Sequence, residues 1–125
     1  MEKVLGAVAA ELAAAGINYE YGWYTSDEIH YPYWVGEYTE TEGTTEDGVR
    51  EGQIMLTGTN MGTALDLERD RAKIERAFPR VEGKAVEVEG GYACFWYANA
   101  LTVPVDVEDL NRIQININFK EWRVL

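Results

Sequence analysis

Two β-rich arms of one predicted long hairpin decide the fold of this chain: Tyr33-Trp34-Val35-Gly36-Glu37-Tyr38-Thr39 and Gln53-Ile54-Met55-Leu56-Thr57-Gly58-Thr59. An Asp47-Gly48 dipeptide lies between the arms, and this pair is a strong turn signal because both residues accept a positive φ. The span that joins the arms is acidic, with Glu40, Glu42, Glu46, Asp47 and Glu51. We therefore expect the arms to join a sheet and the tip to be solvated and negative.

The composition favours a single soluble α+β domain spanning residues 1–125. Apolar residues make up 46% and charged residues 26% of the chain, which are ordinary values for a globular protein. The formal net charge of -11 is unusual. Such a chain repels phosphate at long range, which argues against sequence-reading nucleic-acid binding and against attachment to anionic lipid.

The only cysteine is Cys94, so no intramolecular disulfide is expected and an intracellular origin is favoured. The N-terminus does not have the pattern of a signal peptide. No stretch approaches the ~20 apolar residues of a membrane span.

Two amphipathic helices flank the hairpin in the sequence. The first is predicted over residues 2–15, where Leu5, Val8 and Leu12 fall on one face. A short strand over residues 17–24 follows it. The second helix is predicted from Thr63 to about Phe78, with a start resembling a capping box.

The C-terminal third is β-rich and ends in the cleanest pattern of the chain. Strands are predicted over residues 84–89, 93–103 and 113–120. The middle strand is apolar on both faces, as in a strand covered on both sides. In the last strand, isoleucine and phenylalanine alternate with polar residues, and the apolar Trp122 out of phase indicates a bulge or an added contact at the end.

The predicted order is therefore α-β-β-β-α-β-β-β, and the predicted fold is an antiparallel sheet with two helices packed on one face. The opposite face of the sheet then carries a set of large aromatic residues. Such a patch usually marks an interface, so we expect a subunit interface formed by Trp34, Tyr38, Phe95 and Tyr97.

No motif for catalysis, metal binding or phosphate binding is found in the sequence. His30 is the only histidine, no CxxC pair exists, and neither GxxxxGK[ST] nor GxGxxG occurs. The acidic tip does not have the ligand spacing of an EF-hand loop. We expect no enzymatic activity, no metal and no cofactor.

The layout of residues 1–80 resembles the tail-terminator and tail-completion (minor tail) proteins of long-tailed phages and prophages. The resemblance rests on the strand that opens at Pro32-Tyr33, the strand ending in Leu56-Thr57-Gly58-Thr59, and the charged helix closing in Ala77-Phe78. The C-terminal third departs from this pattern, having an extra β segment and the aromatic run 95–97.

The resemblance implies a non-enzymatic ring, typically of six copies, at the end of the tail tube. Such a ring stops tube growth and contacts the tail tube protein and the neck or head-connector proteins. DNA passes through it without specific binding. The resemblance also implies residence in the virion, with assembly in the bacterial host cytoplasm. The doubly apolar strand would form the head-to-tail contact, and the acidic hairpin, with Glu42, Glu46, Asp47 and Glu51, would face the lumen or a docking rim.

Two other functions stay open at the level of the sequence. The first is a small bacterial ligand-binding or regulatory α+β module. The second is an enzyme that uses carboxylates in an aromatic cleft lined by Tyr19, Trp23, Trp34 or Trp96.

Overall fold

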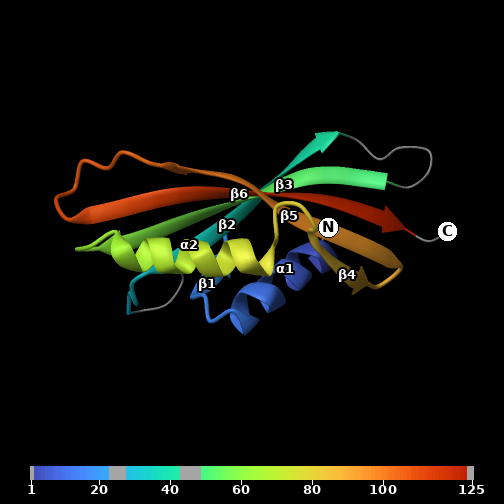
Figure 1. Cartoon of the computed structure of the whole chain (residues 1–125), viewed down its shortest axis with the longest axis horizontal. Coiled ribbons are helices and arrows are strands. Elements are labelled where there is room, and N and C mark those ends of the chain that lie inside the picture. The colour runs from blue at the N-terminus through green and yellow to red at the C-terminus, as the bar shows by residue number, and fades with distance from the viewer. Residues whose placement is uncertain (1, 23–27, 43–48, 124–125) are drawn as a thin grey trace.

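The chain folds into a six-stranded sheet with two helices (Figure 1). The computed structural model describes residues 2–22, 28–42 and 49–123. The predicted order of elements is confirmed. The elements are α1 (Glu2–Ala14), β1 (Tyr19–Tyr21), β2 (Tyr33–Glu42), β3 (Val49–Met61), α2 (Leu65–Ala77), β4 (Lys84–Val88), β5 (Gly91–Thr102) and β6 (Leu110–Arg123). Neither helix in these ranges is long and apolar enough to cross a membrane.

The strands are arranged in the order β1-β2-β3-β6-β5-β4, and the sheet is mixed. β2 and β3 form the predicted antiparallel hairpin, with Trp34 opposite Gly58. The expectation of a purely antiparallel sheet is wrong at one edge, where β1 runs parallel to β2. Parallel neighbours need a longer connection than a tight hairpin turn, and eleven residues separate the end of β1 from the start of β2.

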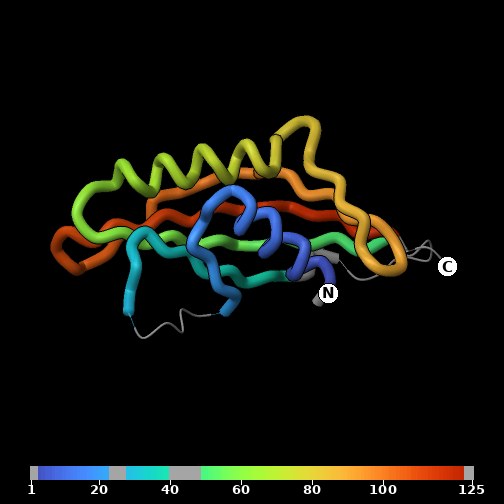
Figure 2. Tube along the Cα trace, turned by 90° about the horizontal axis from the view of Figure 1, so that it is seen from below, coloured from blue at the N-terminus to red at the C-terminus, as the bar shows by residue number. Residues whose placement is uncertain are grey.

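Both helices pack on the same side of the curled sheet (Figures 1 and 2). α1 contacts the two edge strands, β1 and β4, whereas α2 contacts β3 and β6. One apolar core joins the helices to alternate residues of the strands. Its fully buried members include Val4, Val8, Leu12, Trp34, Ile54, Leu56, Leu67, Ile74, Phe78, Phe95, Ile115 and Ile117.

Three glycines on the helix side of the sheet make room for aromatic rings. A methyl group at Gly58 would lie 2.6 Å from the ring of Trp34, and one at Gly52 would lie 2.6 Å from the ring of Phe119. A methyl group at Gly36 would collide with the ring of Tyr19. Strand glycines therefore let large rings lie flat against the sheet beneath the helices.

The prediction that β5 is covered on both faces is corrected by the burial of its side chains. The pairing with β6 shifts register between Tyr97 and Asn99. Before the bulge, Phe95 and Tyr97 are buried on the helix side, and Trp96 lies on the other side. One face of β5 is therefore core, and the other is only partly covered.

Of the two alternatives predicted at Trp122, a bulge or an added contact, the bulge does not form. Trp122 pairs with Val49 on one side and with Tyr92 on the other, with no break in register. The alternation of β6 continues to its end, and the inward position after Phe119 is occupied by a buried acid, Glu121, instead of an apolar residue. Arg50, across from it on β3, approaches it at 3.9 Å.

We predict that Gly58→Ala lowers the free energy of unfolding by about 1–3 kcal/mol, because the Trp34 ring must move to admit a methyl group. Gly6→Ala is the matched control, since a methyl group there meets nothing within 4 Å. In the interior of α1 this change is expected to stabilise by about 0.5–1 kcal/mol. Urea unfolding of both variants measures the effects, and equal stability of the two would contradict the close packing of Trp34 on Gly58.

Candidate assembly surface

The expected interface of Trp34, Tyr38, Phe95 and Tyr97 is not a surface of the folded chain. Trp34, Phe95 and Tyr97 are at most 1% exposed and lie beneath the helices. The sequence does not show which face of the sheet the helices cover, and this is why the expectation places these rings on the wrong face. Only Tyr38, with 36% of its surface exposed, remains available to another chain.

Contacts between α2 and two of these rings explain their burial. The indole Nε1 of Trp34 donates to Oδ2 of Asp70 at 2.9 Å. Nε of Arg71 donates to the Tyr97 hydroxyl at 2.9 Å, and the guanidinium of Arg80 stacks on the Tyr97 ring at 4.5 Å. The polar group of each ring therefore has a hydrogen-bond partner on α2, and the Tyr97 ring also contacts an arginine from the turn after α2.

These contacts alter the acid–base properties of the groups involved. Burial raises the pKa of Asp70 above its usual range, although the hydrogen bond from Trp34 and the charge of Lys73 oppose this effect. The hydrogen bond to Tyr97 raises the pKa of Arg71. Burial, with a smaller contribution from Tyr21, raises the pKa of Tyr19 to about 12. The rings and carboxylates involved hold the core together rather than forming an open site.

The predicted acidic hairpin is only partly described. Glu51 lies on β3 and pairs with Lys120 at 3.1 Å, so its charge is partly compensated. Glu42 ends β2, and its side chain lies outside the described residues, as do Glu46 and Asp47 entirely. The lumen or docking role of these acids stays a prediction.

The side of the sheet away from the helices, called here the helix-free face, is rich in amides. Three hydrogen bonds between amide side chains run along and across its strands: Gln53 to Asn118 at 3.1 Å, Gln114 to Asn116 at 3.2 Å and Asn116 to Asn99 at 2.6 Å. We call these hydrogen-bonded side chains the amide ladder. In the sequence, the alternation of residues 113–120 identifies one of the strands that carry it. The partners Gln53 and Asn99 become visible only when the register is known.

Aromatic residues occupy one end of the helix-free face. Tyr92 and Trp122 lie directly opposite each other and expose 55% and 40% of their surfaces. Trp96 lies on the same face, opposite Asn118. Cross-strand aromatic pairs of this kind combine apolar area with polar groups, which is the usual character of a protein contact surface.

The aromatic cleft that would support an enzyme does not form among the described residues. Tyr19 and Trp34 lie on the helix side of the sheet, whereas Trp96 lies on the opposite side. Trp23 is outside the described residues. Within the described ranges, no three histidine, cysteine or acidic residues come together as metal ligands, and His30 is exposed near Glu28.

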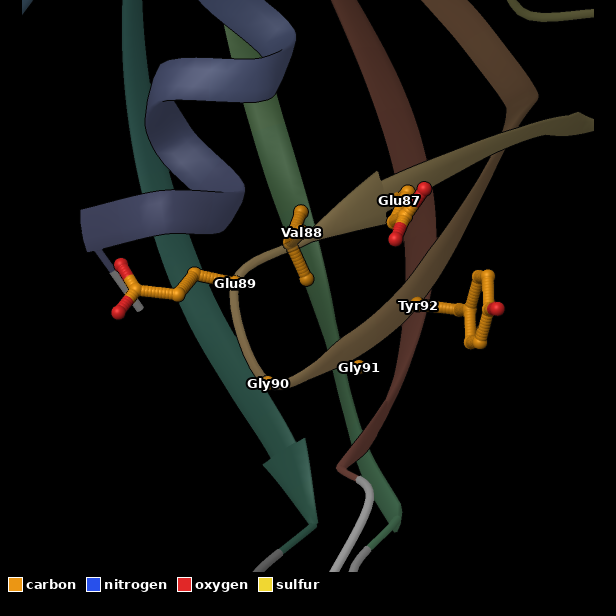
Figure 3. Close-up of a pocket in the computed structure, with 6 residues that line it drawn as sticks. All are labelled: Glu87, Val88, Glu89, Gly90, Gly91 and Tyr92. Atoms are coloured by element: carbon orange, nitrogen blue, oxygen red, sulfur yellow. The ribbon is translucent and has the colours of Figure 1, made fainter.

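A hollow at the β4–β5 turn is the candidate pocket shown in Figure 3. It is lined by the six consecutive residues 87–92. Glu87 and Tyr92 project to one side, whereas Glu89 projects toward α1 and pairs with Lys3 at 3.1 Å (Figure 3). Residues of a single turn form one wall, so this hollow does not enclose a ligand.

Comparison with known proteins gives a likeness in structure but none in sequence. No protein-family model matches the chain, and no curated protein matches its sequence. A solved structure described as the virion of native gene transfer agent (GTA) particle contains a chain with the same fold, with a TM-score of 0.68 and 13% sequence identity. The match covers 92% of this chain and 91% of that one. At this identity the likeness establishes a shared fold.

The raised pKa of Asp70 predicts a pH dependence of stability. The folded protein holds the Asp70 proton to a higher pH than the unfolded chain, so this residue's contribution to stability falls as pH rises from about 3.8 through the folded-state pKa. Asp70→Asn removes this titration. The difference in unfolding free energy between wild type and variant should therefore shrink or reverse as pH rises, as measured by urea unfolding at a series of pH values. A difference that is constant with pH contradicts the assignment.

We predict that Phe95→Asp destabilises the fold by more than about 3 kcal/mol, because it removes a core ring and buries a charge. Tyr38→Asp, at a half-exposed position, is the matched control and should cost less than about 1 kcal/mol. Thermal unfolding monitored by circular dichroism compares the two variants. If Phe95→Asp unfolds cooperatively at the melting temperature of the wild-type protein, the Phe95 ring lies on the surface and not in the core.

Proposed function

We propose that this chain is a structural, non-enzymatic subunit of a phage-like virion. In this proposal it forms a ring, of six copies, at the end of a tail tube, where it terminates the tube and joins it to the neck. The observation that carries the proposal is the fold shared with a chain of a virion particle over almost the full length of both chains. The layout of the hairpin and α2, which resembles tail-terminator and tail-completion proteins, supports the finer assignment.

The surface of the chain supports a role in assembly. The helix-free face is an array of amides with exposed aromatic residues at one end. A surface of this type suits contact with another protein better than capture of a small molecule. Tail tube and neck proteins are the partners that this role requires.

The net charge of -11 supports a role beside DNA. In a ring through which DNA passes, negative charge weakens adhesion of the phosphate backbone. The acidic hairpin, with Glu42, Glu46, Asp47 and Glu51, is the proposed source of this charge at the lumen or the docking rim. The protein then resides in the virion and, before assembly, in the bacterial host cytoplasm.

Deletion of the gene from a strain that produces the particles tests this role. Because terminator subunits stop tube growth, we expect tails of unregulated length, or heads without tails, in electron micrographs of the lysate. The wild-type gene and the Gly6→Ala variant, supplied separately, should both restore uniform tails. Particles of normal number and tail length after deletion would rule out the terminator role.

A further inference from the structure

Two strands of the sheet extend beyond their outer neighbours and leave open edges. β1 pairs only with residues 34–36 of β2, so that on this side of β2 no strand among the described residues lies beside Glu37–Glu42, which pair with β3 on the other side. β4 pairs only with residues 91–95 of β5, which leaves the segment after the bulge without a strand on that side within the described ranges. Figure 1 shows both open segments at the outer margin of the sheet.

Neighbouring elements contact other stretches near the margin on the β4–β5 side. α1 contacts β4 along its length, with Glu11 near Lys84 and Lys3 near Glu89. The turn after α2 covers the middle of β5, because the backbone N–H of Tyr97 donates to the carbonyl of Phe78 at 2.9 Å. The open part of β5 is therefore Asn99–Thr102.

Backbone groups on both open segments point outward. The N–H of Trp34 donates to Asn18 on the β1 side, and the carbonyl of Gly36 accepts from Gly22 on the same side. Because backbone groups alternate along a strand, Tyr38 and Glu40 present theirs to the open edge. On β5, Val103 donates to Arg112 of β6, so its neighbour Thr102 and then Ala100 point outward.

We infer that the open edge of β2 in one copy pairs with the open edge of β5 in a second copy. This inference rests on the proposed function and specifies how the subunits join. β2 and β5 run in opposite directions within the sheet. If the second copy is related to the first by a rotation about an axis along the strands, strand direction is unchanged, and β2 of one copy lies antiparallel to β5 of the other. The two surfaces differ, so the contact is head-to-tail and closes into a ring if the rotation permits.

Charge complementarity supports a second copy as the occupant. The β2 segment carries Glu37, Glu40 and Glu42 in sequence. Beside the open edge of β5 lies Arg80, half-exposed, whose Nη1 donates to the carbonyl of Ala98 at 3.5 Å. In an antiparallel pairing with Tyr38 opposite Thr102 and Glu40 opposite Ala100, the acidic end of β2 runs toward the part of β5 beside which Arg80 lies.

The pairing predicts a specific cross-link. With those two hydrogen-bonded pairs, Thr39 and Leu101 form the closely spaced pair between them, and both lie on the helix-free face with exposed side chains. Their Cβ atoms then lie about 4.5–5.5 Å apart, within reach of a disulfide bridge after small adjustment. Cys94→Ser removes the native thiol from the experiment.

The test oxidises the Thr39→Cys/Leu101→Cys double variant in the Cys94→Ser background and separates the products on a non-reducing gel. We expect a ladder of multimers that ends at the ring size, since each copy carries both halves of the contact. Each single variant should stay monomeric, and a mixture of the two should stop at dimers. The Gly6→Ala change in the same double-cysteine background should leave the ladder unchanged.

Two outcomes overturn the edge pairing. One is a double variant that cross-links no more than the single variants, which would mean that the acids of β2 protect an exposed edge from association. The other is cross-linking of one single variant to itself, which would indicate a two-fold contact instead. If gene deletion causes a tail defect but the double variant gives no ladder, the virion role stands and the edge pairing is rejected. If the double variant gives the ladder but gene deletion causes no tail defect, the edge pairing stands and the terminator role is rejected.

Discussion

The packing of Trp34 between β3 and α2 is the constraint on which most of this structure depends. Its ring lies on Gly58 of the neighbouring strand, and its indole nitrogen donates to Asp70 of α2. One fully buried side chain thus fixes the distance between the hairpin and the helix. The free-energy cost of burying the indole N–H is offset by its hydrogen bond to the carboxylate of Asp70, which is why an acid is tolerated on the buried side of α2.

The sequence predicts most of the elements but not the faces on which their side chains lie. The alternation of residues 113–119 identifies a half-buried strand, and β6 contains it. The face assignment of β5 failed because apolar residues on both sides of a strand do not distinguish core from surface. The deciding facts are the pairing of Phe95 with Phe119 and of Tyr97 with Ile117, which places both rings on the buried side of the sheet. The sequence does not indicate the parallel pairing of β1, because residues 22–32 have no periodic pattern.

The candidate surface was predicted even less completely, and the reason is again register. Tyr38 is the one expected interface residue that is still exposed, and it lies at the start of the open β2 edge. The amide ladder combines residues separated by up to 65 positions in the chain. Sequence periodicity describes each strand alone, whereas an assembly surface depends on which strands lie beside each other and where each one stops.

The central claim is that open strand edges, not buried aromatic residues, join the subunits. Hydrogen–deuterium exchange of the monomeric and the assembled protein tests it most directly. The account predicts that the amides of Tyr38, Glu40, Ala100 and Thr102 gain protection on assembly, because each acquires a backbone partner in the next copy. Unchanged exchange at these four amides in a fully assembled ring, with new protection elsewhere, would contradict it.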